Sequence, residues 1–93
     1  MCDDILNITK HNFEKTVIKS SLPVMLVLWS KNYPGCIRLY ETVKMLVPQY
    51  RDSIRFALID VDIQPELSSQ LCIGGLPCVL ILRNGRICSS IGG

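Results

Sequence analysis

The chain has 93 residues and a formal net charge of +2, and 48% of its residues are apolar. This length predicts a single domain over residues 1–93, and the composition is typical of a globular domain with a large core. Lysine and arginine are scattered without forming a basic stripe, so we do not expect the chain to bind nucleic acid. The apolar stretches are too short to span a membrane, so we expect no membrane partner.

Five cysteines, at positions 2, 36, 72, 78 and 88, have neither zinc-site spacing nor the pattern of a disulfide framework. We therefore expect no metal and no cofactor, and we interpret most of these cysteines as small apolar core residues. The acidic start, Met1–Asp4, lacks the features of a signal peptide. The expected location is cytoplasmic, or the stroma or matrix of an organelle if a transit peptide has been removed.

The first part of the chain predicts a strand, a helix and a second strand. Ile5–Ile8 is typical of a short strand, and Thr9 offers a cap for the helix that follows. The apolar stripe of this helix consists of Phe13, Val17 and Ile18. Pro23 ends the helix, and the continuous apolar run Val24–Trp29 predicts a central strand that is buried on both faces.

A long helix is predicted after the turn at Pro34-Gly35, because proline is favoured early in a helix. From Cys36 onward, apolar residues recur at three- and four-residue spacings. They are Leu39, Tyr40, Val43, Leu46 and Val47. Pro48 disfavours helical geometry in the residue before it, so we expect the helix to end or kink at Val47.

The remaining elements alternate in the same way. Ile54–Val61 predicts a second buried strand, and Pro65–Gln70 predicts a short helix. Val79–Leu82 predicts a third strand, and Asn84-Gly85 is a strong signal for a hairpin turn into the strand Arg86–Ile91. Strands that alternate with helices pair in parallel, and the final hairpin adds an antiparallel edge. The sequence therefore predicts an α/β domain whose mixed sheet has helices on both faces.

Five segments carry a resemblance to one known family through their order and spacing. They are Trp29, Cys36, Asp60-Val61-Asp62, Gly75-Leu76-Pro77 and Arg83-Asn84-Gly85. On these segments the chain resembles the thioredoxin family over nearly its whole length. The resemblance implies a thioredoxin fold, in which a central mixed β-sheet is flanked by helices. It also implies that Trp29 opens the active-site loop, that Cys36 matches the second, resolving cysteine of Cys-Gly-Pro-Cys, and that Pro77 is a cis-proline facing the active cysteines.

The active-site loop departs from the family pattern. Tyr33 occupies the position of the attacking cysteine, and the order Pro34-Gly35 reverses the Gly-Pro of the family. Val27 and Leu58 stand where the family has a buried acid and a lysine that serve proton transfer. Disulfide chemistry within one motif needs one sulfur to attack and a second to resolve. We therefore expect a member of a redox-homeostasis family that lacks ordinary dithiol disulfide reductase activity.

Two interpretations of Cys36 remain open. In the first turn of a helix, the helix dipole and the backbone N–H groups favour a thiolate, which would allow monothiol exchange with glutathione. Alternatively, Cys36 is half-buried beneath the loop and inert. Cys78 is interpreted either as a core strand residue or as a second thiol bonded to Cys36, which requires Cα atoms within about 7 Å.

The resemblance also implies a shallow apolar groove that holds an extended peptide. Its residues would be Trp29, Tyr33, Gly75, Leu76 and Pro77. Peptide binding of this kind does not require a dithiol. The leading hypothesis is therefore a thioredoxin-like protein that binds client or partner proteins, and the alternative is a glutathione-linked oxidoreductase that uses Cys36.

The end of the chain adds two expectations. The family continues past the last strand into a helix that packs on the sheet, and this helix is missing here. Either the chain is part of a longer one, or a second copy or another segment covers the apolar patch, or the fold is adjusted. A remote alternative rests on Gly92-Gly93, an ending typical of ubiquitin-like modifiers and sulfur carriers with a β-grasp fold.

Overall fold

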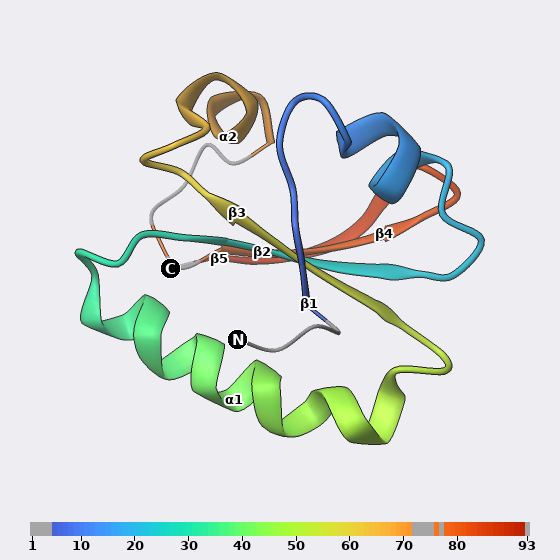
Figure 1. The fold of residues 1–93 in the computed structure, drawn as a ribbon, viewed down its shortest axis with the longest axis horizontal. Helices are drawn as coiled ribbons and strands as arrows, with labels where there is room; N and C mark the ends of the chain where they lie inside the picture. Colours follow the sequence, from blue (N-terminus) through green and yellow to red (C-terminus); the bar gives the residue numbers. More distant parts are fainter. Residues whose placement is uncertain (1–4, 72–75, 77, 93) are drawn as a thin grey trace.

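The computed structural model describes residues 5–71, 76 and 78–92. Strands alternate with helices along the first part of the chain, and a hairpin ends it (Figure 1). In chain order the elements are β1 (Ile5–Asn7), η1 (Glu14–Ile18), β2 (Val24–Trp29), α1 (Pro34–Tyr50), β3 (Arg55–Asp60), α2 (Pro65–Leu71), β4 (Cys78–Arg83) and β5 (Arg86–Gly92). This order agrees with the elements predicted from the sequence, and β2 has the predicted bounds.

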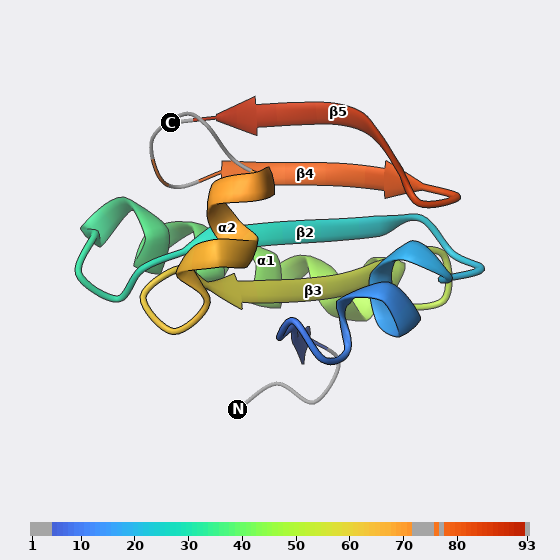
Figure 2. The ribbon, with the colours of Figure 1, turned by 90° about the horizontal axis from the view of Figure 1, so that it is seen from above.

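The five strands form one mixed sheet in the spatial order β1-β3-β2-β4-β5. β1 and β2 each pair in parallel with β3, whereas β4 is antiparallel to β2 and β5 is antiparallel to β4. α1 covers one face of the sheet, and η1 and α2 cover the other (Figures 1 and 2). The predicted α/β architecture is confirmed. The β-grasp alternative is wrong, because that fold lacks this repeated strand-helix-strand order.

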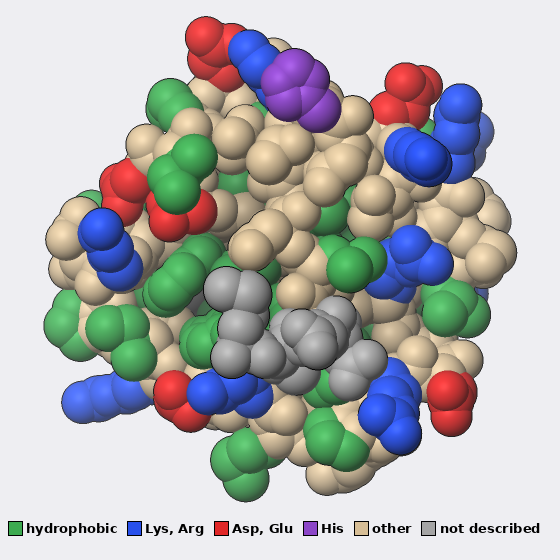
Figure 3. Space-filling model, in the orientation of Figure 1, with side chains coloured by type: hydrophobic (Ala, Val, Ile, Leu, Met, Phe, Trp, Pro, Cys, Tyr) green, Lys and Arg blue, Asp and Glu red, His purple; other side chains and the backbone are tan. Residues whose placement is uncertain are grey.

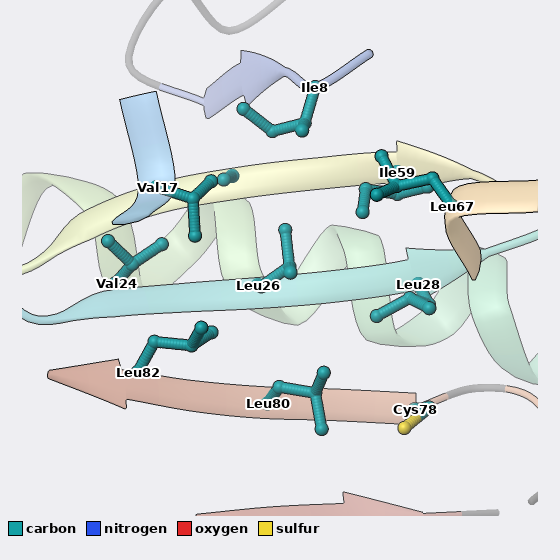
Figure 4. Close-up of a cluster of buried hydrophobic side chains, with 11 residues drawn as sticks. Ile8, Val17, Val24, Leu26, Leu28, Ile59, Leu67, Cys78, Leu80 and Leu82 are labelled. Atoms are coloured by element: carbon teal, nitrogen blue, oxygen red, sulfur yellow. The ribbon is translucent and has the colours of Figure 1, made fainter. Parts of the chain in front are cut away.

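Two apolar cores lie on the two faces of the sheet, because the central strands are buried on both sides. The core beneath η1 and α2, here called the η1/α2 cluster, includes Val17, Leu26, Leu28, Ile59, Leu67, Cys78, Leu80 and Leu82 (Figure 4). The other core, here called the α1 cluster, consists of Ile5, Val27, Val43, Val47, Phe56, Leu58 and Val79. Each fully buried aliphatic side chain contributes about 1.5–3 kcal/mol, so these clusters supply most of the stabilising free energy.

η1 is a short π-helix and spans less of the chain than the helix predicted between Thr9 and Pro23. Asn12 explains the late start, because its Oδ1 accepts a hydrogen bond from the Thr9 N–H at 2.8 Å and its Nδ2 donates to the Asn7 carbonyl at 3.0 Å. Such local bonds from a side chain to the backbone compete with helix formation. The predicted apolar stripe is confirmed, since its three members, Phe13, Val17 and Ile18, belong to the η1/α2 cluster or pack against it.

α1 continues through Pro48 to Tyr50, so the predicted end of this helix at Val47 is wrong, while the alternative of a kink there stays a prediction. Pro48 lacks an N–H donor, but the Arg51 N–H donates to the Val47 carbonyl at 2.9 Å and closes the last turn. Val47 itself is buried in the α1 cluster. Packing of this last turn against the sheet therefore outweighs the local preference of proline.

The β4-β5 hairpin turns at Asn84 and Gly85, as predicted. Both residues have positive φ, 54° and 77° respectively, which is the conformation that a type I′ turn requires. A Cβ atom at Gly85 would lie 2.9 Å from Ile18 Cγ2 and 3.2 Å from the Ile18 carbonyl oxygen. Glycine is therefore required by the backbone conformation and also by the close contact with η1.

β5 is the edge strand, and its residues 86–91 are all exposed. Ile91 lies opposite Val79, a member of the α1 cluster, and so leaves the strand on the face that α1 covers elsewhere. A register shift between Ile81 and Leu82 places Ile87 opposite Leu82, on the other face. Of these two exposed residues only Ile91 lies on the α1 face, and the bare patch and any segment that covers it remain predictions.

Charged side chains are dispersed over the face shown in Figure 3, where lysine and arginine alternate with aspartate and glutamate. On α1, Glu41 Oε2 and Lys44 Nζ form an ion pair at 3.2 Å. Among the described helices, none combines the length and the apolar character that crossing a membrane would need.

Candidate functional site

The candidate site lies at the carboxyl ends of the parallel strands β2 and β3. Trp29 is the last residue of β2, and its partner in the strand register is Asp60, the last residue of β3. A short loop of residues 30–33 then leads from β2 into α1 (Figure 1). Sites that bind ligands commonly occupy this edge of α/β sheets, because the loops after parallel strands meet there.

Ser30 fixes the loop to the end of β3. Its side chain is buried, and its Oγ donates a hydrogen bond of 2.6 Å to Asp62 Oδ2. The same Oγ accepts a hydrogen bond from the Asn32 N–H at 3.2 Å, and the Tyr33 N–H donates to the Ser30 carbonyl at 3.1 Å. A bond to a carboxylate is stronger than one between neutral groups. The loop conformation is therefore set by an interaction with the turn that follows β3.

The contact between Ser30 and Asp62 is not among the features predicted from the sequence, where Asp60-Val61-Asp62 carries only the resemblance to the family. Asp62 is itself oriented by its neighbour, since its N–H donates to Asp60 Oδ1 at 2.9 Å. One sequence signal for this contact exists. Ser30 is a small polar residue directly after the apolar strand Val24–Trp29, and Asp62 follows the next predicted strand, which is parallel to the first and ends at the same edge of the sheet.

Tyr33 is the residue that precedes α1, at the position where the family has its attacking cysteine. Its backbone is extended, with φ −114° and ψ 112°, and its side chain does not cap the helix. Its carbonyl accepts a hydrogen bond from the Cys36 N–H at 3.0 Å, and its side chain is 52% exposed. Pro34 and Gly35 are exposed as well and open the helix. At the position where the family has its attacking cysteine, this chain therefore exposes the phenol ring of Tyr33 to solvent.

Cys36 lies in the first turn of α1, as predicted, but its side chain is 0% exposed. Cys78 begins β4 and packs in the η1/α2 cluster (Figure 4). No disulfide joins these two residues in the described part of the chain, so that alternative for Cys78 is not supported. Cys88 lies on the exposed edge strand and is not a core residue, contrary to the general expectation for the cysteines. Cys2 and Cys72 lie outside the described residues.

Val27 and Leu58 are direct neighbours across β2 and β3. Both belong to the α1 cluster, and their exposed fractions are 1% and 7%. Neither side chain can take up or release a proton. At the two positions where the family has its proton-transfer pair, the structure therefore has continuous apolar packing.

Trp29 packs against α1. Its ring stacks on Tyr40 with a centroid distance of 5.6 Å and an interplanar angle of 17°. Lys44, four residues after Tyr40 on α1, places its Nζ 5.1 Å from the centre of the Tyr40 ring and makes a cation–π contact. Trp29 is thus held by the helix that begins at Pro34, after the loop of residues 30–33.

Of the residues of the predicted peptide groove, the structure describes Trp29, Tyr33 and Leu76. Gly75 and Pro77 lie outside the described residues, so the cis-proline and the groove remain predictions. Leu76 packs against the η1/α2 cluster, whereas Trp29 packs against the α1 cluster. These two groove residues therefore belong to different cores, and Tyr33 is the most exposed of the described members.

A metal site is not formed by the described residues, since they contain no group of three histidine, cysteine, aspartate or glutamate side chains suited to hold one. A pocket of about 540 Å³ lies beside Trp29 and is lined mainly by apolar residues. Neither Tyr33 nor Cys36 lines it, so it is separate from the loop.

Comparisons with known proteins point to one family. The family model named Thioredoxin matches residues 4–93. The chain is 30% identical over 87 residues to a thioredoxin of Acidithiobacillus ferridurans, which covers 94% of this chain and 81% of that protein. It is 28% identical over 80 residues to a thioredoxin of Rickettsia bellii, with 86% and 76% covered. It is 26% identical over 86 residues to thioredoxin 1 of Synechococcus elongatus, with 92% and 80% covered.

Proposed function

Since this chain belongs to the thioredoxin family, we propose that it binds extended segments of client proteins at the Tyr33 loop and does not act as a dithiol disulfide reductase. The observation that carries the proposal is the pairing of an exposed Tyr33 with a fully buried Cys36. A reductase needs an accessible sulfur to attack and a second sulfur to resolve the mixed disulfide. Here the accessible position holds an aromatic ring, and the remaining sulfur is enclosed.

The surface around the loop supports binding rather than chemistry. Tyr33 and Ile37 are large exposed apolar residues at the start of α1, and Pro34 lies between them. Tyrosine is enriched at protein interfaces because its ring buries a large area while its hydroxyl keeps a polar partner. Ser30 and Asp62 hold the loop in one conformation. A loop that is already ordered loses little conformational entropy when it binds a peptide.

Glutathione-linked exchange at Cys36 is the competing function. In that reaction the Cys36 thiolate would attack the disulfide of oxidised glutathione, form a mixed disulfide and release one glutathione thiolate. Cys36 lies in the first turn of α1 and is the thiol that this reaction would use. The complete burial of its side chain opposes the reaction, because the incoming sulfur cannot reach it until the loop opens.

Client binding is tested with a fluorescein-labelled, S-carboxymethylated insulin B chain, which is unfolded and has no disulfide to exchange. We expect Tyr33→Ala to weaken binding about thirtyfold, the size of an aromatic hot spot. Tyr50→Ala is the matched control, because Tyr50 is similarly exposed but lies at the opposite end of α1. Fluorescence anisotropy measures both affinities, and equal effects of the two substitutions would refute the assignment of the loop.

The absence of reductase activity is tested separately. Wild-type protein is expected to accelerate the reduction of insulin by dithiothreitol no more than Cys36→Ser does. Turnover comparable to that of the Acidithiobacillus ferridurans thioredoxin would overturn the proposal. Glutathione-dependent activity that disappears in Cys36→Ser would instead establish the competing function.

A further inference from the structure

The outer side of β5 is open for pairing with a further strand. Within the described residues β5 pairs with β4 alone, and Figure 2 shows it as the outermost strand of the sheet. Its residues 86–91 are all exposed. The backbone N–H and C=O groups on the outer side of an edge strand have no strand partner, so an extended segment can add to them.

Charged side chains and proline, which commonly protect such an edge, are missing from residues 87–92. Ile87 and Ile91 are instead 50% and 66% exposed. The ladder to β4 has a register shift between Ile81 and Leu82. A shift of this kind bends an edge strand and disfavours long, flat pairing. A segment that adds to β5 therefore needs a further source of affinity.

Two arginines lie at the end of this edge where the hairpin turns. Arg83 and Arg86 are directly opposite each other in the β4-β5 register, and both are exposed. Side chains in such a pair leave the sheet on the same face, and two like charges there are destabilising. Among the described residues, no carboxylate forms an ion pair with either guanidinium. Acidic groups of a partner would therefore relieve the repulsion within this pair.

We propose that β5 binds an extended segment of another protein that ends in acidic residues. The segment runs antiparallel to β5, since antiparallel pairing is the more stable arrangement. Its carboxyl-terminal end then lies beside Arg86, where aspartate or glutamate side chains meet both arginines. A second copy of β5 is a poorer fit, because residues 86–92 contain no acidic side chain. The site lies outside the Tyr33 loop, so it stands even if client binding at that loop fails.

The probe is a rhodamine-labelled peptide of sequence Thr-Val-Thr-Val-Thr-Glu-Glu with an amidated end, whose β-branched residues favour a strand. Its control has Gln-Gln in place of Glu-Glu, which keeps the shape and removes the charge. We expect the control peptide to bind at least about fivefold more weakly in fluorescence anisotropy. Equal binding of the two peptides, or no binding of the acidic one, would overturn the proposal.

Hydrogen exchange locates the bound peptide. We expect saturating acidic peptide to slow exchange at least about tenfold for those backbone amides of residues 86–92 that face away from β4, because strand pairing protects them. Protection at residues 30–37 instead would place the peptide at the Tyr33 loop and would contradict binding at β5.

A charge swap tests the two arginines. Arg83→Glu/Arg86→Glu reverses the pair and keeps two like charges opposite each other, so the hairpin should remain folded. We expect this double variant to bind the acidic peptide about tenfold more weakly and to prefer a peptide that ends in Lys-Lys. Lys10→Glu/Arg38→Glu is the matched control, because both residues are exposed outside β5 and the net charge changes by the same amount.

The control variant should bind the acidic peptide within about twofold of wild type. Equal weakening in the two double variants would show attraction by net charge alone and would refute a contact with the arginine pair. Analytical ultracentrifugation of the protein without peptide tests the other occupant. A dimer that protects the amides of residues 86–92 from exchange would assign the edge to a second copy of this chain and overturn the proposal.

Discussion

Ser30 and Asp62 lie 32 residues apart in the chain, yet the Ser30 hydroxyl donates a 2.6 Å hydrogen bond to the Asp62 carboxylate. Ser30→Ala would leave this carboxylate without the donor and would release the loop before α1. Hydrogen bonds to charged groups contribute about 1.5–3 kcal/mol, and we expect a loss of unfolding free energy of that size. Urea denaturation measures it. Ser89→Ala, on the exposed strand β5, should change the stability by less than about 0.5 kcal/mol.

Tyr33→Cys would place a second sulfur at the exposed position before α1. We expect this variant to reduce insulin in the presence of dithiothreitol above the wild-type background, because one thiol could then attack and Cys36 could resolve. Its rate should remain at least about 100-fold below that of an ordinary thioredoxin, because Val27 and Leu58 provide no general acid or base. The double variant Tyr33→Cys/Cys36→Ser must lose the gained turnover for this explanation to hold.

Val27→Asp would bury a carboxylate in the α1 cluster and should destabilise the protein by about 3 kcal/mol or more. Leu58→Lys in the same chain should recover at least about 1 kcal/mol of that loss, since the two residues are direct neighbours across the strands. Chemical denaturation of the two single variants and the double variant completes a double-mutant cycle. A coupling energy of zero would mean that the two side chains do not meet on the α1 face.

Gly85→Ala should destabilise the β4-β5 hairpin by about 1–2 kcal/mol, because it combines a positive φ with a clash against η1. Asn84→Gly is the control in the same turn, since glycine accepts the positive φ of that position without strain. We expect the control to stay within about 0.5 kcal/mol of wild type. Thermal unfolding followed by circular dichroism distinguishes the two, and equal midpoints for both variants would argue against the contact between Gly85 and Ile18.

Iodoacetamide should modify Cys88 before Cys36 and Cys78. Cys88 is exposed on the edge strand, whereas Cys36 and Cys78 are buried. Alkylation of a buried thiol requires local opening of the structure, so we expect Cys36 to react about 100-fold more slowly than Cys88 under native conditions. Peptide mass spectrometry follows each site separately. Rapid alkylation of Cys36 would show that the loop opens readily and would favour glutathione-linked exchange.

Continuous apolar runs and turn residues made the strands and the hairpin predictable. Val24–Trp29 is buried on both faces, and Asn84-Gly85 suits few conformations other than the observed turn. The helix ends were less predictable, because tertiary packing at Val47 outweighs the local preference of Pro48. In the same way, the hydrogen bonds of Asn12 delay η1 beyond its predicted start.

In the candidate site, too, some features were predictable from the sequence and others depend on tertiary packing. Tyr33, Cys36, Val27 and Leu58 were placed from the sequence, because their positions follow from the order of motifs along one chain. The contact between Ser30 and Asp62 and the stack of Trp29 on Tyr40 depend on how separate elements are registered. The pocket also depends on that register, since it forms where β1, β3, α1 and residues 63–64 meet. The spacing of residues in the sequence does not predict such contacts between separate elements.

The neighbouring pair Val27 and Leu58 has a consequence for the dependence of stability on pH. A buried acid beside a lysine binds protons differently in the folded and unfolded states, and this difference makes the free energy of unfolding change with pH. Two aliphatic side chains at those positions bind no proton in either state. The centre of the sheet is therefore uncoupled from proton binding at this point. Its contribution to stability stays constant while the surroundings become more acidic or more alkaline.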